Sequence, residues 1–125
     1  MMVLEPNEIV GKVLDYRLRH AGLEVTLCLD YEAALPTAKA LHPDLILIEP
    51  KAERGMETLA ALRRAFPHLP ILVLTVYLDE MMLAQAEAVG ATDCLLKQLD
   101  WCDLLRRIEA AMKQPLPFNC EARGG

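Results

Sequence analysis

The sequence predicts an α/β fold, a doubly wound (βα)5 arrangement in which helices cover both faces of a parallel sheet. Three short apolar runs each end in a polar residue: residues 45–48 precede Glu49, residues 71–74 precede Thr75, and residues 94–96 precede Lys97. Continuous apolar runs of this length suit strands that are buried on both faces of a parallel sheet. Helical periodicity separates the runs, and a βα unit repeated five times requires right-handed crossovers that place helices on both sides.

The first βα unit is predicted to be a strand over residues 2–5 followed by a helix that ends near Gly22. Asn7 suits the N-cap of this helix, because its side chain can accept a hydrogen bond from the first turn. Apolar residues that share one stripe indicate the buried face of the helix, namely Val10, Leu14 and Leu18.

The second unit is predicted to be a strand over residues 23–28 and a helix that Asp30 caps and that ends near Leu41. Pro36 falls inside this helix if it starts at Tyr31. Because proline removes a backbone donor, it either kinks the helix or marks a later first turn. Both alternatives remain open at this point.

The third and fourth units continue the pattern with a strand that ends at Glu49, a helix over residues 56–66, a strand over 71–75 and a helix over 79–89. The fifth unit is a strand over 93–96 and a helix that Asp100 caps. We expect a domain over residues 1–114 and a tail or linker over 115–125, where Pro and Gly accumulate. One domain of five such units suggests the flavodoxin-like strand order 2-1-3-4-5.

The composition indicates one globular domain and excludes several classes of partner. The 125 residues are 54% apolar and 25% charged, with a formal net charge of -5, which is typical of a soluble protein with its own core. The negative charge argues against direct nucleic-acid contact by this domain, which needs clustered basic residues. No apolar run approaches a membrane span, and Glu5 and Glu8 interrupt any signal-peptide pattern, so we expect a cytoplasmic protein without membrane contact.

The cysteines do not predict a metal site. They stand at positions 28, 94, 102 and 120 with no close pair, and the three histidines lie far from them in sequence. Reduced and mostly buried thiols are therefore the expected state, with Cys120 the most exposed.

Four stretches, taken in order, resemble the receiver domain of two-component response regulators, over residues 2 to about 114. They are residues 5–8, 42–49, 71–75 and 90–97. In that family a strand-three aspartate is phosphorylated, two acidic residues after strand one help to bind Mg²⁺, and a strand-four Thr or Ser and a strand-five Lys contact the phosphoryl oxygens. The resemblance implies a non-enzymatic receiver domain in phosphorelay signal transduction.

Carried over position by position, the resemblance makes Thr75 and Lys97 remnants of a phosphate site and places Glu49 at the phosphoacceptor position. Glu5 matches the first acidic position and is the remaining candidate metal ligand, whereas Pro6 replaces the second. Mg²⁺ tolerates little departure from its octahedron. The extra methylene of Glu49 moves its carboxylate by roughly an ångström, and positioning errors of ~1 Å can slow transfer ~100-fold. We therefore expect no cofactor and no ordinary Mg²⁺ binding.

Two further departures concern the segment around Lys97. Cys94 stands where the family often has an aromatic residue, and Gln98 stands where it usually has a proline, often after a cis peptide. Because a cis bond before a non-proline residue costs ~2.5–4 kcal/mol, we predict a trans Lys97–Gln98 peptide.

Two functions follow from the resemblance. One is a pseudo-receiver that works through protein–protein interaction independently of phosphorylation. The other is a phosphorylation-competent response regulator in a two-component phosphorelay that uses Glu49 as the acceptor. Glu49 with Lys97 either imitates the phosphorylated state or forms a structural ion pair. A flavin binder or enzyme of the same fold is disfavoured, because residues 6–8 after the first strand form no Gly-rich phosphate loop.

A protein partner or a homodimer is expected through the face formed by helix four, strand five and helix five, because this face commonly mediates dimerisation or effector docking in the resembling family. Four residues are predicted on or near the surface of helix four: Tyr77, Met81, Ala84 and Ala88. Ordinary partial burial accounts for scattered small residues equally well. The sequence identifies neither the partner nor the pathway, and it leaves open whether the chain is complete or part of a longer regulator.

Overall fold

The computed structural model describes residues 1–52 and 54–116 of the chain. Within these residues, one five-stranded parallel sheet has the order β2-β1-β3-β4-β5, which confirms the predicted flavodoxin-like topology. The strands are β1 (Met2–Leu4), β2 (Thr26–Cys28), β3 (Ile46–Ile48), β4 (Ile71–Thr75) and β5 (Asp93–Leu96).

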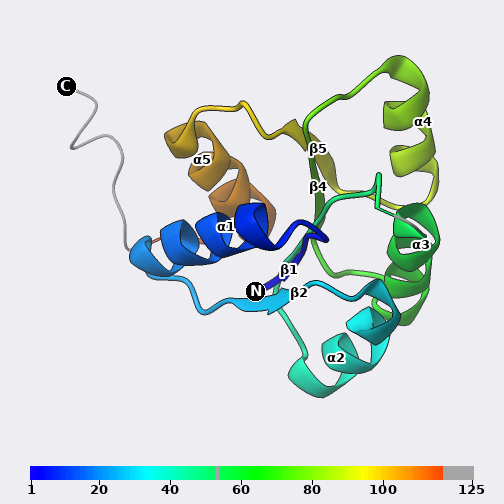
Figure 1. The fold of residues 1–125 in the computed structure, drawn as a ribbon, viewed down its shortest axis with the longest axis horizontal. Helices are drawn as coiled ribbons and strands as arrows, with labels where there is room; N and C mark the ends of the chain where they lie inside the picture. Colours follow the sequence, from blue (N-terminus) through cyan, green and yellow to red (C-terminus); the bar gives the residue numbers. More distant parts are fainter. Residues whose placement is uncertain (53, 117–125) are drawn as a thin grey trace.

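Helices cover both faces of the sheet, as Figure 1 shows. The helices are α1 (Glu8–His20), α2 (Ala34–Leu41), α3 (Gly55–Ala65), α4 (Glu80–Ala88) and α5 (Trp101–Met112), with a 3₁₀ turn, η1 (Tyr31–Ala33), before α2. Helices α1 and α5 lie together on one face, while α2, α3 and α4 cover the other. This is the layered arrangement that repeated right-handed βα crossovers produce.

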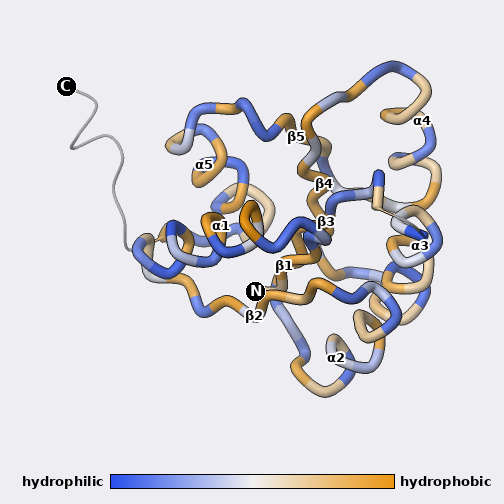
Figure 2. Tube along the Cα trace, in the orientation of Figure 1, coloured by the Kyte–Doolittle hydropathy of each residue, from blue (hydrophilic) through white to orange (hydrophobic). Residues whose placement is uncertain are grey.

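The core consists of two apolar layers, one on each side of the sheet. Successive residues of β3 alternate between them: Leu47 packs in the layer that contains Leu18 of α1 and Ile108 of α5, whereas Ile46 and Ile48 pack in the layer beneath α2 and α3. Alternation with a period of two is the geometry of a strand. In Figure 2 the central strands are accordingly coloured as hydrophobic.

Side-chain caps begin the helices: Asn7 caps α1, as the sequence predicts, and Asp79, predicted as the first residue of its helix, caps α4. Asn7 Oδ1 accepts from the Val10 amide at 3.1 Å, and Asp79 Oδ1 accepts from the Met82 amide at 2.7 Å. These bonds satisfy amides that have no partner inside the first helical turn. After α4, Gly90 has a φ of +108°, a conformation that favours glycine and ends the helix.

Several predicted boundaries differ from the observed ones: those of α3 and α4 by one residue at each end, and others as follows. Residues 23–25 do not join β2, because the strand pairs only with the three residues of β1. Glu5 likewise lies just beyond β1. Asp30 caps η1, and α2 begins only at Ala34, so Pro36 lies in the first turn of α2. The alternative of a later first turn is therefore correct, and the proline is tolerated there.

The cysteine prediction is only partly correct. Cys28 and Cys94 are free thiols, but Cys102 is disulfide-bonded, so the expectation of reduced thiols is wrong for that residue. Cys120 and most of the predicted tail lie outside the described residues. At the start of that tail, Leu116 is buried against the core layer of α1 and α5 and donates its amide to Glu109.

The described helices include none that is long and apolar enough to cross a bilayer.

Candidate functional site

The ends of four neighbouring strands bring the predicted polar residues to one edge of the sheet. Glu5 follows β1, Glu49 follows β3, Thr75 ends β4 and Lys97 follows β5. Glu5, Glu49 and Thr75 are buried, with exposures of 2%, 8% and 0%. Carboxyl ends of parallel strands form the edge where such folds bind ligands. Because their strands are parallel and end at the same edge, Glu5 and Lys97 meet here although they are 92 positions apart in sequence.

Lys97 lies between the two carboxylates. Its ammonium donates to Glu5 Oε1 and to Glu49 Oε1, the second across 3.0 Å. Burial by itself would lower the pKa of Lys97, but its hydrogen bonds to Glu5 and Glu49 and their negative charges together raise that pKa above its ordinary value. The lysine therefore stays charged and neutralises part of the repulsion between two buried acids.

Each carboxylate uses its second oxygen to accept from a backbone amide two residues further along the chain. Asn7 donates to Glu5 Oε2 at 3.0 Å, and Lys51 donates to Glu49 Oε2 at 3.1 Å. Buried charges require partners of this kind. Both oxygens of Glu5 and both oxygens of Glu49 consequently have a partner.

Tyr31 contacts the backbone next to both carboxylates, and the sequence reasoning did not identify it. Its buried hydroxyl lies 2.7 Å from the carbonyl oxygens of both Leu4 and Glu49 and shares its single proton between these two acceptors. Burial and the nearby charges of Glu5 and Glu49 raise the pKa of Tyr31. Tyr31 thus joins the ends of β1 and β3. The only sequence signal is an aromatic residue directly after the Asp30 cap.

Thr75 forms a backbone hydrogen bond at the site, while its side chain forms none that is described. Its carbonyl oxygen accepts the Lys97 amide at 2.7 Å, which ties the end of β4 to the segment after β5. Its hydroxyl oxygen is buried and has no hydrogen-bond partner among the described residues. A buried polar atom without a partner costs ~1–3 kcal/mol, so this hydroxyl is an available donor at the site.

The residues at this edge do not suit a divalent cation. The Lys97 ammonium contacts the Oε1 atoms of both carboxylates, and position 6 is an exposed proline without a side-chain ligand atom. In the described part of the chain, no group of three or more His, Cys, Asp or Glu side chains is arranged to hold a metal. Glu5 therefore binds the ammonium in a place where Mg²⁺ would require a further oxygen ligand.

The structure shows the consequences of the two departures around Lys97, namely Cys94 in place of an aromatic residue and Gln98 in place of a proline. The Lys97–Gln98 peptide is trans, as predicted, because the described residues contain no cis peptide bond. Cys94 packs at the edge of the core layer beneath α3 and α4, and burial raises the pKa of its thiol to about 11. The position therefore holds a small neutral side chain rather than an aromatic ring.

The predicted interaction residues lie at the surface. Tyr77 and Met81 are 61% and 71% exposed, and Ala84 and Ala88 on α4 are exposed as well. The Lys51 ammonium lies 4.6 Å from the centroid of the Tyr77 ring, a cation–π geometry. Because the Lys51 amide also binds Glu49, one residue connects the buried site to this surface.

Comparison with known proteins shows which family this chain resembles. The family model described as "Response regulator receiver domain" matches residues 1–109. The chain is 29% identical over 117 residues to the alkaline phosphatase synthesis transcriptional regulatory protein PhoP of Bacillus subtilis, covering 91% of this chain and 48% of PhoP. It is 31% identical over 113 residues to protein RcaC of Microchaete diplosiphon, covering 86% of this chain and 17% of RcaC. The chain thus spans about half or less of these curated relatives.

Solved structures show the same fold. The chemotaxis protein CheY4 of Vibrio cholerae superimposes with a TM-score of 0.82 at 25% identity, covering 88% of this chain and 95% of CheY4. The BeF3-activated N-terminal receiver domain of Klebsiella pneumoniae RstA gives a TM-score of 0.84 at 24% identity, covering 90% of this chain and 97% of that domain. The second likeness concerns the fold alone.

Proposed function

The chain belongs to the response regulator receiver domain family, and we propose that it acts there as a pseudo-receiver. A pseudo-receiver works by association with another protein and does not depend on phosphorylation. Receiver domains are signalling modules of two-component systems that contact partner proteins or effector domains. The proposal therefore concerns how this member is controlled.

The observation that carries the proposal is the pair of bonds from Lys97 to Glu5 and Glu49. An acceptor carboxylate needs a free oxygen to attack the phosphorus of the donor and a nearby cation to stabilise the charge of the phosphoryl group while the donor's leaving oxygen departs. Here Glu49 accepts from Lys97 with one oxygen and from the Lys51 amide with the other. Position 6 offers no carboxylate that would recruit the cation. Both deficits act against phosphoryl transfer at the same site.

The proposed partner surface is the face of α4, β5 and α5, with Tyr77, Met81, Ala84 and Ala88 in contact with the partner or with a second copy. A chain of contacts supports it: Glu49 accepts from the Lys51 amide, and the Lys51 ammonium stacks over Tyr77. This arrangement would hold the Tyr77 ring at the surface without a phosphoryl group. A protein that lacks the usual trigger could in this way keep one fixed binding face.

A second candidate is a phosphorylation-competent response regulator with Glu49 as the acceptor. The buried Thr75 hydroxyl favours it, because that donor has no partner among the described residues and would gain one from a phosphoryl oxygen. Lys97 would then have to leave Glu49 to contact the incoming group. The longer acceptor side chain and Pro6 still oppose this route.

Incubation with a small acyl phosphate and Mg²⁺, followed by intact mass measurement, separates the two candidates. The pseudo-receiver keeps its mass, whereas a phosphorylation-competent domain gains the mass of one phosphoryl group. The Glu49→Gln variant serves as the control, because it removes the proposed acceptor with little change in shape. An adduct on the parent protein that is lost in Glu49→Gln would establish the second candidate.

The boundary near residue 114 and a cytoplasmic location remain predictions.

A further inference from the structure

Helix α1 carries an apolar stripe on the side that faces away from the core. Its buried residues are Gly11 and Leu18, whereas Ile9, Val13 and Tyr16 are 77%, 52% and 63% exposed. Positions spaced by four and three residues share one face of a helix, and this face is opposite Leu18. A helix at a protein surface normally presents charged and polar residues there.

The stripe continues to the C-terminal end of α1. The ring of His20 lies 4.1 Å from the ring of Tyr16, centroid to centroid, and His20 Nδ1 is 3.0 Å from the Tyr16 carbonyl oxygen. Single apolar residues scattered over a surface are ordinary, but apolar side chains aligned along a whole helix indicate a contact surface. We define this set, Ile9, Val13, Tyr16 and His20, as the α1 stripe.

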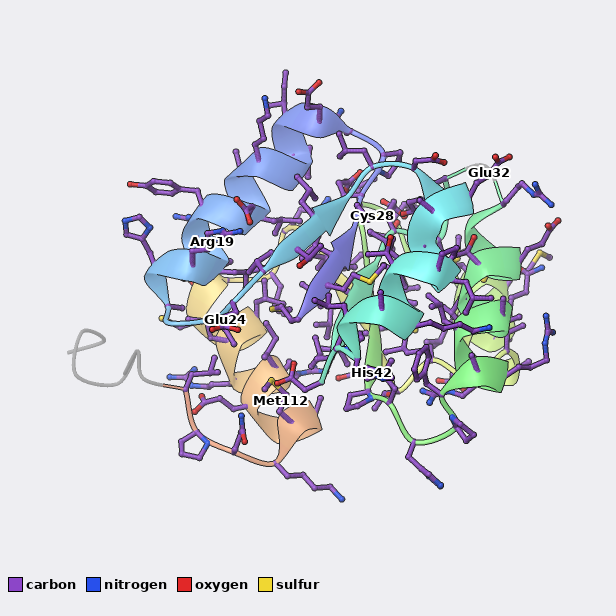
Figure 3. The ribbon with its side chains drawn as sticks, turned by 90° about the horizontal axis from the view of Figure 1, so that it is seen from below. Arg19, Glu24, Cys28, Glu32, His42 and Met112 are labelled. Carbon is purple, nitrogen blue, oxygen red and sulfur yellow. The ribbon has the colours of Figure 1, made fainter. Side chains whose placement is uncertain are left out.

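A row of alternating charges runs beside the α1 stripe. In chain order the row is negative, positive, negative and positive: Glu8, Lys12, Asp15 and Arg19. Within the helix, Glu8 pairs with Lys12 at 2.9 Å and Asp15 with Arg19 at 2.8 Å. Arg19, labelled in Figure 3, also donates to the Val25 carbonyl oxygen. Three of the four side chains are more than half exposed, and Asp15 is 29% exposed.

We propose that the α1 stripe is a self-association surface, on which α1 of a second copy of this chain packs in the antiparallel direction. Reading the charged row backwards reverses every sign, so an antiparallel copy places Glu8 opposite Arg19 and Lys12 opposite Asp15 of the second copy. A parallel copy would place the two charged rows on opposite sides of the contact, where they could not pair with each other. The contact is isologous, as twofold dimers require, and its charges select one orientation.

The size of the surface sets the strength of the contact. A helix of 13 residues is about 20 Å long. One face of such a helix offers less area than the ~800 Å² per partner of a standard interface. The dimer is therefore weak, reversible and dependent on protein concentration. Added salt weakens it further, because exposed ion pairs are screened.

This inference is independent of the proposed function. Helices α1 and α4 cover opposite faces of the sheet (Figure 1), and the stripe includes none of the residues at the carboxylate site. A pseudo-receiver that stays monomeric would overturn the self-association surface and leave the proposed function. A domain that is phosphorylated and dimerises through α1 would overturn the proposed function and leave the self-association surface.

Sedimentation velocity of the whole chain over a range of concentrations tests the inference. The parent protein should shift from monomer towards dimer, and Val13→Asp should raise the dissociation constant about tenfold or more, because it buries an unpaired charge. Leu41→Asp is the matched control, since Leu41 is 43% exposed on another helix, and it should leave the association unchanged. Circular dichroism of each variant verifies that the fold is retained.

Charge reversal provides a test that misfolding cannot imitate. Lys12→Glu and Asp15→Lys should each weaken self-association, because each brings like charges together in the antiparallel pair. A mixture of the two variants should restore association as a heterodimer, because unlike charges face each other again. A monomer at every concentration, a dimer that survives Val13→Asp, or a mixture that fails to associate would overturn the proposal.

Discussion

The Lys97 ammonium lies 3.0 Å from Glu49 Oε1 and contacts Glu5 from the same position. One positive charge thus serves two buried carboxylates that come from two different strands. Breaking a buried pair costs more than making it contributes, because the partner is left charged and unpaired. This asymmetry decides how each variant at the site should behave.

Removal of Lys97 should destabilise the protein more than removal of the charge on Glu49. Lys97→Met leaves Glu5 and Glu49 facing each other. We expect it to lower the free energy of unfolding by about 2 kcal/mol, which is less than for a fully buried pair because the Lys97 side chain is 17% exposed. Glu49→Gln retains the pair between Glu5 and Lys97 and should lose about 1 kcal/mol or less. Urea unfolding of both variants and of the double variant measures these values. Equal losses in the two single variants would contradict the shared-lysine geometry.

Restoration of the acidic residues should create a phosphorylation site. Pro6→Asp supplies the missing carboxylate, and Glu49→Asp withdraws the acceptor by one methylene. We expect the double variant to react with a small acyl phosphate in the presence of Mg²⁺ on the order of 100-fold faster than the parent chain. Intact mass against time gives the rate, and each single variant is the control. No gain in the double variant would mean that another feature, such as Gln98, prevents the reaction.

Stability should fall at alkaline pH. Burial and nearby negative charge raise the pKa of Tyr31, and hydrogen bonds to two carboxylates raise the pKa of Lys97 despite burial. A group whose folded pKa is raised stabilises the protein fully below its unfolded pKa, near 10 for both residues, and loses that contribution as pH rises towards the folded pKa. Unfolding free energies measured from pH 7 upward should therefore decrease beyond about pH 10. Tyr31→Phe should show a shallower decrease, and an unchanged slope would argue against the buried position of Tyr31.

The Thr75 hydroxyl should contribute nothing to stability in the absence of an anion. Because it is buried without a partner among the described residues, Thr75→Val should be neutral or stabilising by up to about 1 kcal/mol. Thermal denaturation compares the two proteins, and Thr75→Ser is the control that keeps the hydroxyl. A loss of more than about 1 kcal/mol would show that the hydroxyl has a partner in solution.

Much of the fold follows from local signals in the chain. The bounds of β4 and β5 agree with the prediction, because a continuous apolar run is typical of a strand in a sheet that helices cover on both faces. The edge strand β2 is shorter than predicted. Val25 is β-branched and favours a strand, yet the length of β2 depends on the length of β1, the one strand that pairs with it among the described residues. Propensity cannot report that length.

The site is predictable where it depends on strand ends and unpredictable where it depends on a turn. Glu5, Glu49 and Lys97 meet because each directly follows a strand of one parallel sheet. Tyr31 reaches Glu49 only because the chain after β2 forms η1 and folds back beneath β3. Nothing in the residues around position 31 specifies that path, since the contact is between segments 18 positions apart.

The most direct test of the central claim is nuclear magnetic resonance of the backbone amides of Asn7 and Lys51, which donate to the two carboxylates. Mg²⁺ is added first and beryllofluoride second. With Lys97 bound to both Glu5 and Glu49, neither addition should shift these two resonances beyond a general salt effect matched with NaCl. A saturable shift of either amide would contradict the account, because it would mean that the site accepts a metal or a phosphoryl mimic in place of the lysine.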